Sequence, residues 1–314
     1  MCGIAGFIGG IDGGAAGALA VVTSMANALV HRGPDDGGVW VDDVAGIALG
    51  HRRLSILDLS PEGHQPMMSA SGRYVIAFNG EIYNFRELRA EIEKDPYSPH
   101  PGPLPGGEGI KKNSQHNLVR ESASVSRNDS PSPFGRRWPA EPDEGEGREN
   151  TLFPSQGERL TIGKERLRWR GHSDTEAMLA AFERWGVEAA LRRFVGMFAF
   201  ALWDRAEHRL YLARDRLGEK PLYYGWLGET LVFASELKAL RVHPAWRGAV
   251  NRDALALYMR HDYIPAPYSI YQGIYKLPPG SFLSVNKGGS RGGNDFSPQP
   301  SYTAVSSPLC PVYY

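Results

Sequence analysis

The chain has 314 residues, of which 42% are hydrophobic and 22% charged, a composition typical of a globular protein with one large or two ordinary domains. Lysine plus arginine and aspartate plus glutamate both number 35, so the formal net charge is zero. A chain without excess charge has no broad electrostatic attraction to nucleic acid or to an anionic membrane surface. We therefore expect small molecules as partners, with no nucleic acid and no membrane.

The two cysteines, Cys2 and Cys310, lie at opposite ends of the chain and form neither a disulfide framework nor the spacing of a zinc site. We expect no metal and a reducing, cytoplasmic location. Glycines interrupt the apolar run from Ile4 to Ile11, and nowhere does the sequence contain the roughly eighteen consecutive apolar residues of a membrane span. The sequence predicts neither secretion nor membrane insertion.

Residues 1–94 alternate short β-type runs with glycine turns, which predicts strands at 2–8, 38–41, 45–51 and 74–78. A helix is predicted at 18–30. A second helix is predicted from the N-cap Asn84 to about Lys94, because Phe85, Leu88 and Ile92 share one helical face.

Regular patterns resume near Trp169 after a long Pro-, Gly- and Ser-rich segment. The later elements are helices at 174–185 and 251–260, strands at 197–203, 210–213 and 231–234, and an extended, turn-rich stretch around 264–280.

Cys2 is the residue that first indicates chemistry. Removal of Met1 before this small residue leaves a cysteine with both a thiol and a free α-amine. A free thiol has a pKa of about 8.5 and an α-amine one of about 7.7–8.0, so the amine can accept the thiol proton near neutral pH. If only its position is considered, the simpler interpretation is that Cys2 is a small buried hydrophobic residue. The apolar strand Gly3–Ile8 behind it favours a nucleophile, because a packed strand holds the new terminus rigidly.

Several motifs resemble those of class II glutamine amidotransferases with an N-terminal nucleophile, and most closely those of glutamine-dependent asparagine synthetases. In chain order they are His31–Gly37, Arg53–Ile56, His64–Met67, Phe78–Asn84, Ser173–Asp174, Gly196–Asp204, Ala213–Tyr224 and Ser235–Ala239. The resemblance covers residues 1–94 and 167–285. It implies an α+β fold in which two antiparallel sheets lie between helix layers, the four-layer αββα sandwich, whereas the pattern of elements alone indicates only mixed α+β.

Asn79-Gly80 is a turn dipeptide at the end of a predicted strand, where a side-chain amide and a backbone N–H can both point at one oxyanion. Standing alone, the dipeptide indicates an ordinary hairpin turn. The resemblance implies that Cys2 is the nucleophile and that Asn79 and Gly80 form the oxyanion hole.

Arg53 offers a planar fork for the α-carboxylate of an amino acid, and Glu81 and Asp174 can neutralise its α-ammonium group. Isolated charges are more often solvated or, like Asp174, placed at a helix start. Neighbouring strand residues point to opposite faces, so only one of Arg52 and Arg53 reaches a substrate, and the resemblance favours Arg53. The glutamine-binding residues that it implies are Arg53, Leu54, Ser55, Ile56, Leu57, Asn79, Gly80, Glu81 and Asp174.

The resemblance implies a glutamine amidotransferase type 2 domain at residues 1–94 and 167–245. Residues 246–285 are then expected to be a connector toward an ATP-dependent synthetase domain that this chain lacks. We expect residues 95–166 to be a low-complexity, disordered insertion. Residues 286–314 have the composition of an irregular tail translated outside the normal reading frame, with Cys310 as an incidental thiol.

The leading hypothesis is the glutaminase half of an asparagine synthetase, which hydrolyses L-glutamine to glutamate and ammonia through a cysteine thioester and needs no cofactor. In intact family members, ATP and magnesium serve the synthetase half, where ammonia converts activated aspartate to asparagine. The alternatives are an amidotransferase for another acceptor and a catalytically inactive fragment. The resemblance also implies a homodimer.

Overall fold

A computed structural model describes residues 1–56, 60–94 and 169–286, all of which belong to one structural unit. Leu57, the predicted insertion at 95–166 and the predicted tail with Cys310 lie outside the described residues, apart from residue 286 itself.

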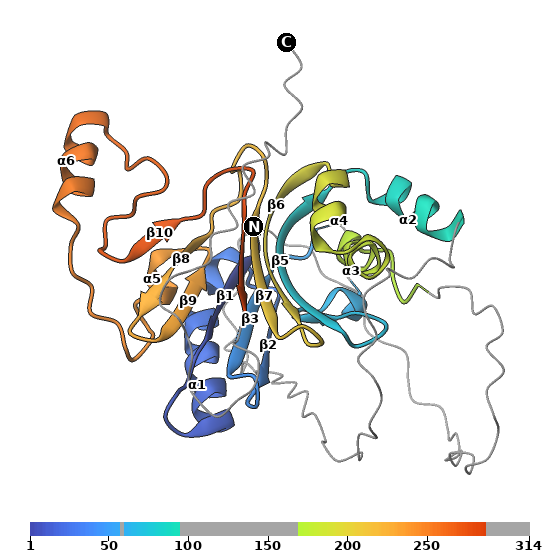
Figure 1. The fold of residues 1–314 in the computed structure, drawn as a ribbon, viewed down its shortest axis with the longest axis horizontal. Coiled ribbons are helices and arrows are strands. Elements are labelled where there is room, and N and C mark those ends of the chain that lie inside the picture. Colours follow the sequence, from blue (N-terminus) through green and yellow to red (C-terminus); the bar gives the residue numbers. More distant parts are fainter. Residues whose placement is uncertain (57–59, 95–168, 287–314) are drawn as a thin grey trace, which may run out of the picture. The chain divides into compact units, whose positions relative to one another are not determined.

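The first sheet has six antiparallel strands in the order β10-β8-β9-β1-β3-β2. Their bounds are β1 Gly3–Ile8, β2 Asp36–Asp42, β3 Ile47–Arg53, β8 Tyr223–Leu227, β9 Thr230–Ala234 and β10 Ile274–Lys276. The N-terminal strand β1 lies in the interior of this sheet, between β3 and β9 (Figure 1). A strand paired on both sides holds the start of the chain firmly.

The second sheet has five antiparallel strands in the order β11-β7-β6-β5-β4. Their bounds are β4 Met67–Met68, β5 Tyr74–Ile82, β6 Gly196–Asp204, β7 Arg209–Arg214 and β11 Phe282–Asn286. Strands β5 and β6 pair over nine residues although more than a hundred residues separate them in the chain.

The two sheets pack face to face because alternate residues of each strand are apolar on the inner face. Ile4 and Ile8 of β1 belong to the same buried cluster as Val75 and Ala77 of β5. This cluster forms the core between the sheets.

Helices cover both outer faces. Helices α1 (Gly14–Asn27) and α5 (Leu237–Leu240) pack on the first sheet, against residues such as Phe7. Helices α2 (Phe85–Lys94), α3 (Asp174–Trp185) and α4 (Val187–Arg193) pack on the second, against residues such as Phe200 (Figure 1). The predicted α+β, four-layer αββα architecture is confirmed.

The sandwich extends beyond residue 245, where the sequence places its end. After α6 (Arg252–His261), β10 pairs with β8 at the edge of the first sheet, and β11 pairs with β7 at the edge of the second (Figure 1). The expectation that 246–285 is only a connector is therefore corrected. Both strands are short edge strands, three and five residues long, so their sequences contain no extended alternation of apolar and polar residues that would predict them.

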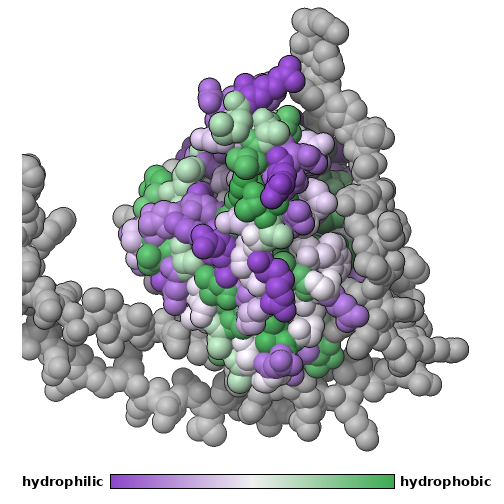
Figure 2. Space-filling model, turned by 90° about the vertical axis from the view of Figure 1, so that its left-hand side faces the viewer, coloured by the Kyte–Doolittle hydropathy of each residue, from purple (hydrophilic) through white to green (hydrophobic). Residues whose placement is uncertain are grey.

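The side of the molecule on which α6 lies mixes hydrophilic and hydrophobic residues at its surface (Figure 2). Helix α6 buries only Ala254 and exposes Leu255, Tyr258 and Met259. Within the described ranges, no helix combines the length and the hydropathy needed to cross a membrane.

Candidate active site

The inner faces of the two sheets bring Cys2, Arg53 and Asn79 to the same end of the sandwich. Cys2 lies two residues before Ile4, which faces the gap between the sheets, so its side chain points to the same face. By the same alternation, Arg53 lies on the same face of β3 as Leu49, and Asn79 lies on the same face of β5 as Ala77. The first sheet thus contributes the thiol and the guanidinium, and the second contributes the amide.

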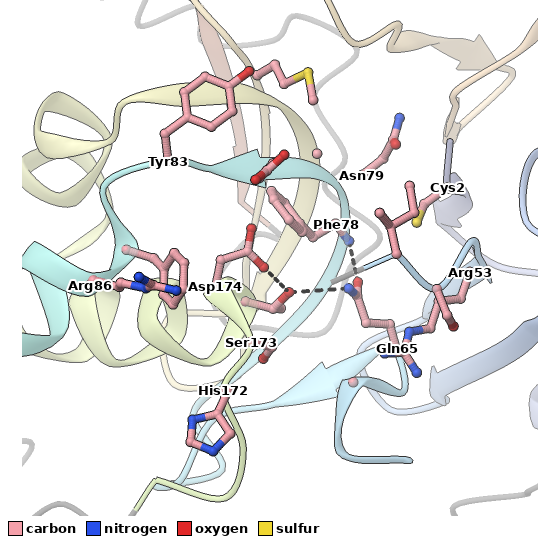
Figure 3. Close-up of a pocket in the computed structure, with 18 of the residues that line it drawn as sticks. Cys2, Arg53, Gln65, Phe78, Asn79, Tyr83, Arg86, His172, Ser173 and Asp174 are labelled. Atoms are coloured by element: carbon pink, nitrogen blue, oxygen red, sulfur yellow. Dashed lines mark hydrogen bonds between the residues drawn. The ribbon is translucent and has the colours of Figure 1, made fainter. Parts of the chain in front are cut away.

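A cavity of about 920 Å³ opens at this end (Figure 3). The predicted site residues that line it are Cys2, Arg53, Leu54, Ser55, Ile56, Asn79, Gly80, Glu81 and Asp174. Of the predicted residues only Leu57 is not placed there, because it lies outside the described residues.

The Cys2 thiol is half-buried and accepts a hydrogen bond from the Leu54 N–H at 3.4 Å. The Ser55 N–H in turn donates to Asp35 Oδ2 at 2.8 Å, which holds the loop that follows β3. Residues 54–56 therefore form a wall of the cavity directly beside the sulfur.

Asn79 and Gly80 do not form a turn. They lie within β5, paired with Ala199 and Phe198 of β6, so the expectation of a strand-ending turn is wrong. The local preference of Asn-Gly for turns is overridden by long-range pairing with β6. Glycine is required at position 80, because a Cβ there would lie 2.2 Å from the Met197 carbonyl oxygen.

Alternation along β5 sets the direction of the Gly80 N–H. The N–H groups of Phe78 and Ile82 donate to Gln65 Oε1 at 2.7 Å and to Asp174 Oδ2 at 2.9 Å, on the side away from β6. Gly80 lies midway between them, so its N–H points to this same side. That side is the cavity.

The Asn79 side chain is 1% exposed, and its Nδ2 has no hydrogen-bond partner among the described residues. An unpaired buried amide costs about 1–3 kcal/mol, so such a group is a candidate for binding a ligand. In Figure 3 the Asn79 amide and the Cys2 sulfur lie on the same side of the cavity. Two N–H donors, from Asn79 and Gly80, and the Cys2 thiol therefore line one cavity.

Arg53 is buried, and its Nη1 donates to the Ser60 carbonyl at 2.9 Å. Its guanidinium packs so closely on Gly63 that a Cβ there would lie 2.0 Å from Nη2. Arg52 points to the opposite face, where its Nη2 donates to Asn27 Oδ1 at 2.8 Å. Of the two arginines, Arg53 lines the cavity and Arg52 does not.

Asp174 is the first residue of α3, and the Ser173 hydroxyl caps this helix by accepting from the Glu176 N–H at 3.3 Å. Burial raises the pKa of Asp174, although hydrogen bonds from the Ile82 and Thr175 N–H groups oppose this shift. Glu81 of β5 lines the same cavity, and its charge also raises the pKa of Asp174. Two carboxylates and the Arg53 guanidinium thus line one cavity.

Gln65 and Thr175 also line the cavity, and the sequence alone assigns them no role. Gln65 Nε2 donates to Thr175 Oγ1 at 3.4 Å, and Thr175 Oγ1 contacts Asp174 Oδ1 at 3.4 Å (Figure 3). Together with the bond from the Phe78 N–H, these contacts tie β5 to α3. The His64–Met67 motif was the only signal for Gln65, whereas nothing local marks Thr175.

Among the residues that the structure describes, no three His, Cys, Asp or Glu side chains are grouped so as to hold a metal ion. The chemistry available at the cavity is that of a thiol, two N–H donors, one guanidinium and two carboxylates.

Two antiparallel sheets packed face to face between helix layers, with the strand that follows Cys2 in the interior of one of them, define the N-terminal-nucleophile class of fold. The chain belongs to the glutamine amidotransferase domain family, whose model matches residues 1–99 and 156–296.

Curated relatives support this assignment. The chain is 30% identical over 269 residues to asparagine synthetase 1 (glutamine-hydrolyzing) of Bacillus subtilis, covering 86% of this chain and 31% of the relative. It is 27% identical over 293 residues to asparagine synthetase 2 of the same organism, covering 91% of this chain and 29% of the relative. The chain thus spans about a third of the length of these relatives.

A solved structure titled as the allosteric regulatory enzyme of purine biosynthesis has a similar fold, with a TM-score of 0.51. It is 17% identical in sequence, and the match covers 91% of this chain and 47% of that chain. At this identity, the similarity concerns the fold alone.

Proposed function

We propose that this chain hydrolyses L-glutamine to glutamate and ammonia through a thioester on Cys2. The observation that carries the proposal is that one cavity is lined by the Cys2 thiol, next to the start of β1, and by the buried Asn79 amide, whose Nδ2 has no partner among the described residues. The family to which the chain belongs makes glutamine the substrate to test first.

The reaction begins once Met1 is removed, because Cys2 then carries a free α-amine. This amine takes the thiol proton, and the sulfur attacks the carboxamide carbon of glutamine. Asn79 Nδ2 and the Gly80 N–H stabilise the oxyanion of the tetrahedral intermediate. The proton on the α-amine passes to the leaving nitrogen, which departs as ammonia, and water then hydrolyses the thioester to glutamate.

Glutamine is oriented by its α-amino-acid group. The Arg53 guanidinium binds the α-carboxylate, and Asp174 and Glu81 bind the α-ammonium group. Leu54, Ser55 and Ile56 form the wall along which the side chain of the substrate reaches Cys2. Neither ATP nor a metal takes part in these steps.

The acceptor of the ammonia follows by analogy with the relatives, which carry the name asparagine synthetase and are about three times as long. We propose that the glutaminase serves the conversion of ATP-activated aspartate to asparagine in a protein of that kind, in the cytoplasm. ATP and magnesium would act in that further part. The homodimer stays a prediction, which sedimentation of the purified chain tests.

Glutamate release without ATP, together with the intact mass of the protein after incubation with diazo-oxo-norleucine, tests the proposal. We expect loss of Met1, one covalent adduct on Cys2, and glutamate formation that Cys2→Ala abolishes. The matched control is Cys310→Ala, which removes the other cysteine and leaves glutamate release unchanged. A chain that has lost Met1 yet forms neither adduct nor glutamate is an inactive fragment.

A further inference from the structure

Cys2 lies just outside the first sheet. Strand β1 begins at Gly3, and its pairing with β9 covers only Ala5–Ile8. Chain termini are poorly ordered unless they are tied down. Strand β3 pairs with β1 from Gly3 onward, so one side of the chain is held. On the other side, positions 2–4 need contacts beyond the β1–β9 ladder.

Ser235, which directly follows β9, supplies the first of these contacts. Its N–H donates to the Ile4 carbonyl at 2.8 Å, and its hydroxyl accepts from the Ile4 N–H at 3.0 Å. Ser235 is fully buried. Its side chain thus replaces a backbone acceptor where the β9 ladder has ended, and it fixes the residue two positions after the nucleophile.

Arg32 and Glu236 supply the second contact. Arg32 Nε donates to the carbonyl oxygen of Cys2 itself at 2.9 Å, and Arg32 Nη1 donates to Glu236 Oε1 at 2.8 Å. Arg32 is buried, whereas its partner is about 29% exposed. The guanidinium has a fixed planar shape, so anchoring one arm on Glu236 sets the direction of the other toward Cys2.

Glu236 is held in turn by His31 Nε2 at 3.1 Å and Lys238 Nζ at 3.2 Å. Burial opposes its ionisation, but hydrogen bonds from Arg32, His31 and Lys238 outweigh burial and lower the pKa of Glu236 to about 2. The carboxylate therefore stays charged over the whole working range of pH. Neither Arg32 nor Glu236 lines the cavity, so neither is placed to touch glutamine.

We propose that Glu236 is a positioning residue for the nucleophile: through Arg32 it holds the carbonyl of Cys2, and its neighbour Ser235 holds Ile4. This inference rests on the proposed glutaminase function. Its chemical consequence concerns the attacking sulfur and not the affinity for glutamine, because the carboxylate and ammonium subsites lie elsewhere. A misplacement of about 1 Å at a reacting atom lowers a rate by about 100-fold.

The first test measures kcat and KM for glutamine in Glu236→Gln and Arg32→Lys. We expect kcat to fall by about tenfold in the former and further in the latter, with KM changed by less than about twofold in both. A lysine keeps the positive charge but lacks the rigid planar fork in which Nε and Nη1 reach Cys2 and Glu236 separately. The matched control is Glu188→Gln, which breaks an equally short Glu–Arg pair on α4, between Glu188 and Arg192 at 2.7 Å, and leaves both constants unchanged.

The second test does not depend on turnover. The alkylation rate of Cys2 by iodoacetamide, read by peptide mapping so that Cys310 is counted separately, reports how well the terminus is held. We expect Glu236→Gln to raise this rate several-fold and Glu188→Gln to leave it at the wild-type value, with thermal unfolding confirming that both variants fold. A Ser235→Ala variant that folds shows the same rise.

The two proposals fail in different ways. If the wild-type chain releases no glutamate, the proposed glutaminase activity is refuted. The alkylation rates still test whether Glu236 positions Cys2. Glu236→Gln that matches Glu188→Gln in kcat and in alkylation overturns the role of Glu236. A rise in KM with unchanged kcat overturns it as well, because it would place Glu236 in substrate binding.

Discussion

His51 of β3 donates a hydrogen bond from Nε2 to the Phe78 carbonyl oxygen of β5 at 2.9 Å, so a fully buried imidazole joins the two sheets one residue before Asn79. The carbonyl can only accept, which requires the proton on Nε2 and, in the neutral ring, leaves Nδ1 without one. Nδ1 has no partner among the described residues. This hydrogen bond can form in either protonation state of the ring, and burial is what favours the neutral imidazole.

The first prediction is that stability falls with acid because of His51. Burial lowers the pKa of His51 from about 6.5 to about 4, so between these values the unfolded chain binds a proton that the folded chain does not. The free energy of unfolding therefore decreases as the pH drops through this window, by up to roughly 3 kcal/mol from this group. Urea unfolding at several pH values checks it. His51→Gln should show a shallower dependence, and equal slopes in the two proteins would contradict the assignment.

The second prediction concerns Asn79→Ala. Loss of one oxyanion donor should lower kcat by about 100- to 1,000-fold with little change in KM. Thermal stability should stay the same or rise slightly, because the substitution removes a buried amide nitrogen that has no partner in the described part of the chain. Steady-state kinetics and thermal unfolding measure the two effects. A raised KM with unchanged kcat would instead place Asn79 in substrate binding.

The third prediction is that Gly80→Ala damages both the fold and catalysis. The new Cβ would collide with the Met197 carbonyl and with the Phe198 backbone, neither of which can move without displacing β6. We expect a loss of about 1–3 kcal/mol in the free energy of unfolding, and reduced kcat in the protein that folds. Gly10→Ala is the control, since a Cβ there meets no atom of the described ranges within 4 Å. Equal stability of the two variants would refute the close approach.

The fourth prediction is that Asp174→Asn weakens glutamine binding while stabilising the fold. Since burial raises the pKa of Asp174, the folded protein holds its proton more tightly than the unfolded chain does, and stability falls as the pH rises through the raised pKa. Asparagine removes this penalty at neutral pH but also removes the charge that faces the substrate ammonium. We expect KM to increase by about tenfold or more. A variant with lower stability and unchanged KM would show a structural role only.

Sequence reasoning located most of the site because its residues lie in contiguous motifs. Strand alternation alone left Arg52 and Arg53 as alternatives, and the resemblance favoured Arg53. In the structure, Arg53 lines the cavity and Arg52 does not. The prediction of a turn at Asn79-Gly80 is wrong because the local preference of these residues competes with pairing to β6. Strand β6 is distant in the chain, so its effect cannot be predicted from the neighbouring residues.

The contacts that support the site residues could not be predicted either, because they also join residues far apart in the chain. Gln65 meets Thr175 across 110 residues, and Arg32 meets Glu236 across 204. Strands β10 and β11 are short edge strands, and only their pairing with β8 and β7 identifies them as strands. Contacts over such separations follow from the folded topology and leave no periodic signal.

The proposed nucleophile and the proposed oxyanion donors lie on different sheets, so the thickness of the apolar core between the sheets sets the distance between them. Sheets stack about 10 Å apart, and the side chains between them set that spacing. Leu49 and Ala77 lie on the inner faces next to the site. We expect a larger residue at Ala77 or a smaller one at Leu49 to change the distance between the Cys2 sulfur and the Asn79 amide without contact with either group. Such core substitutions should then change the rate of glutamine hydrolysis.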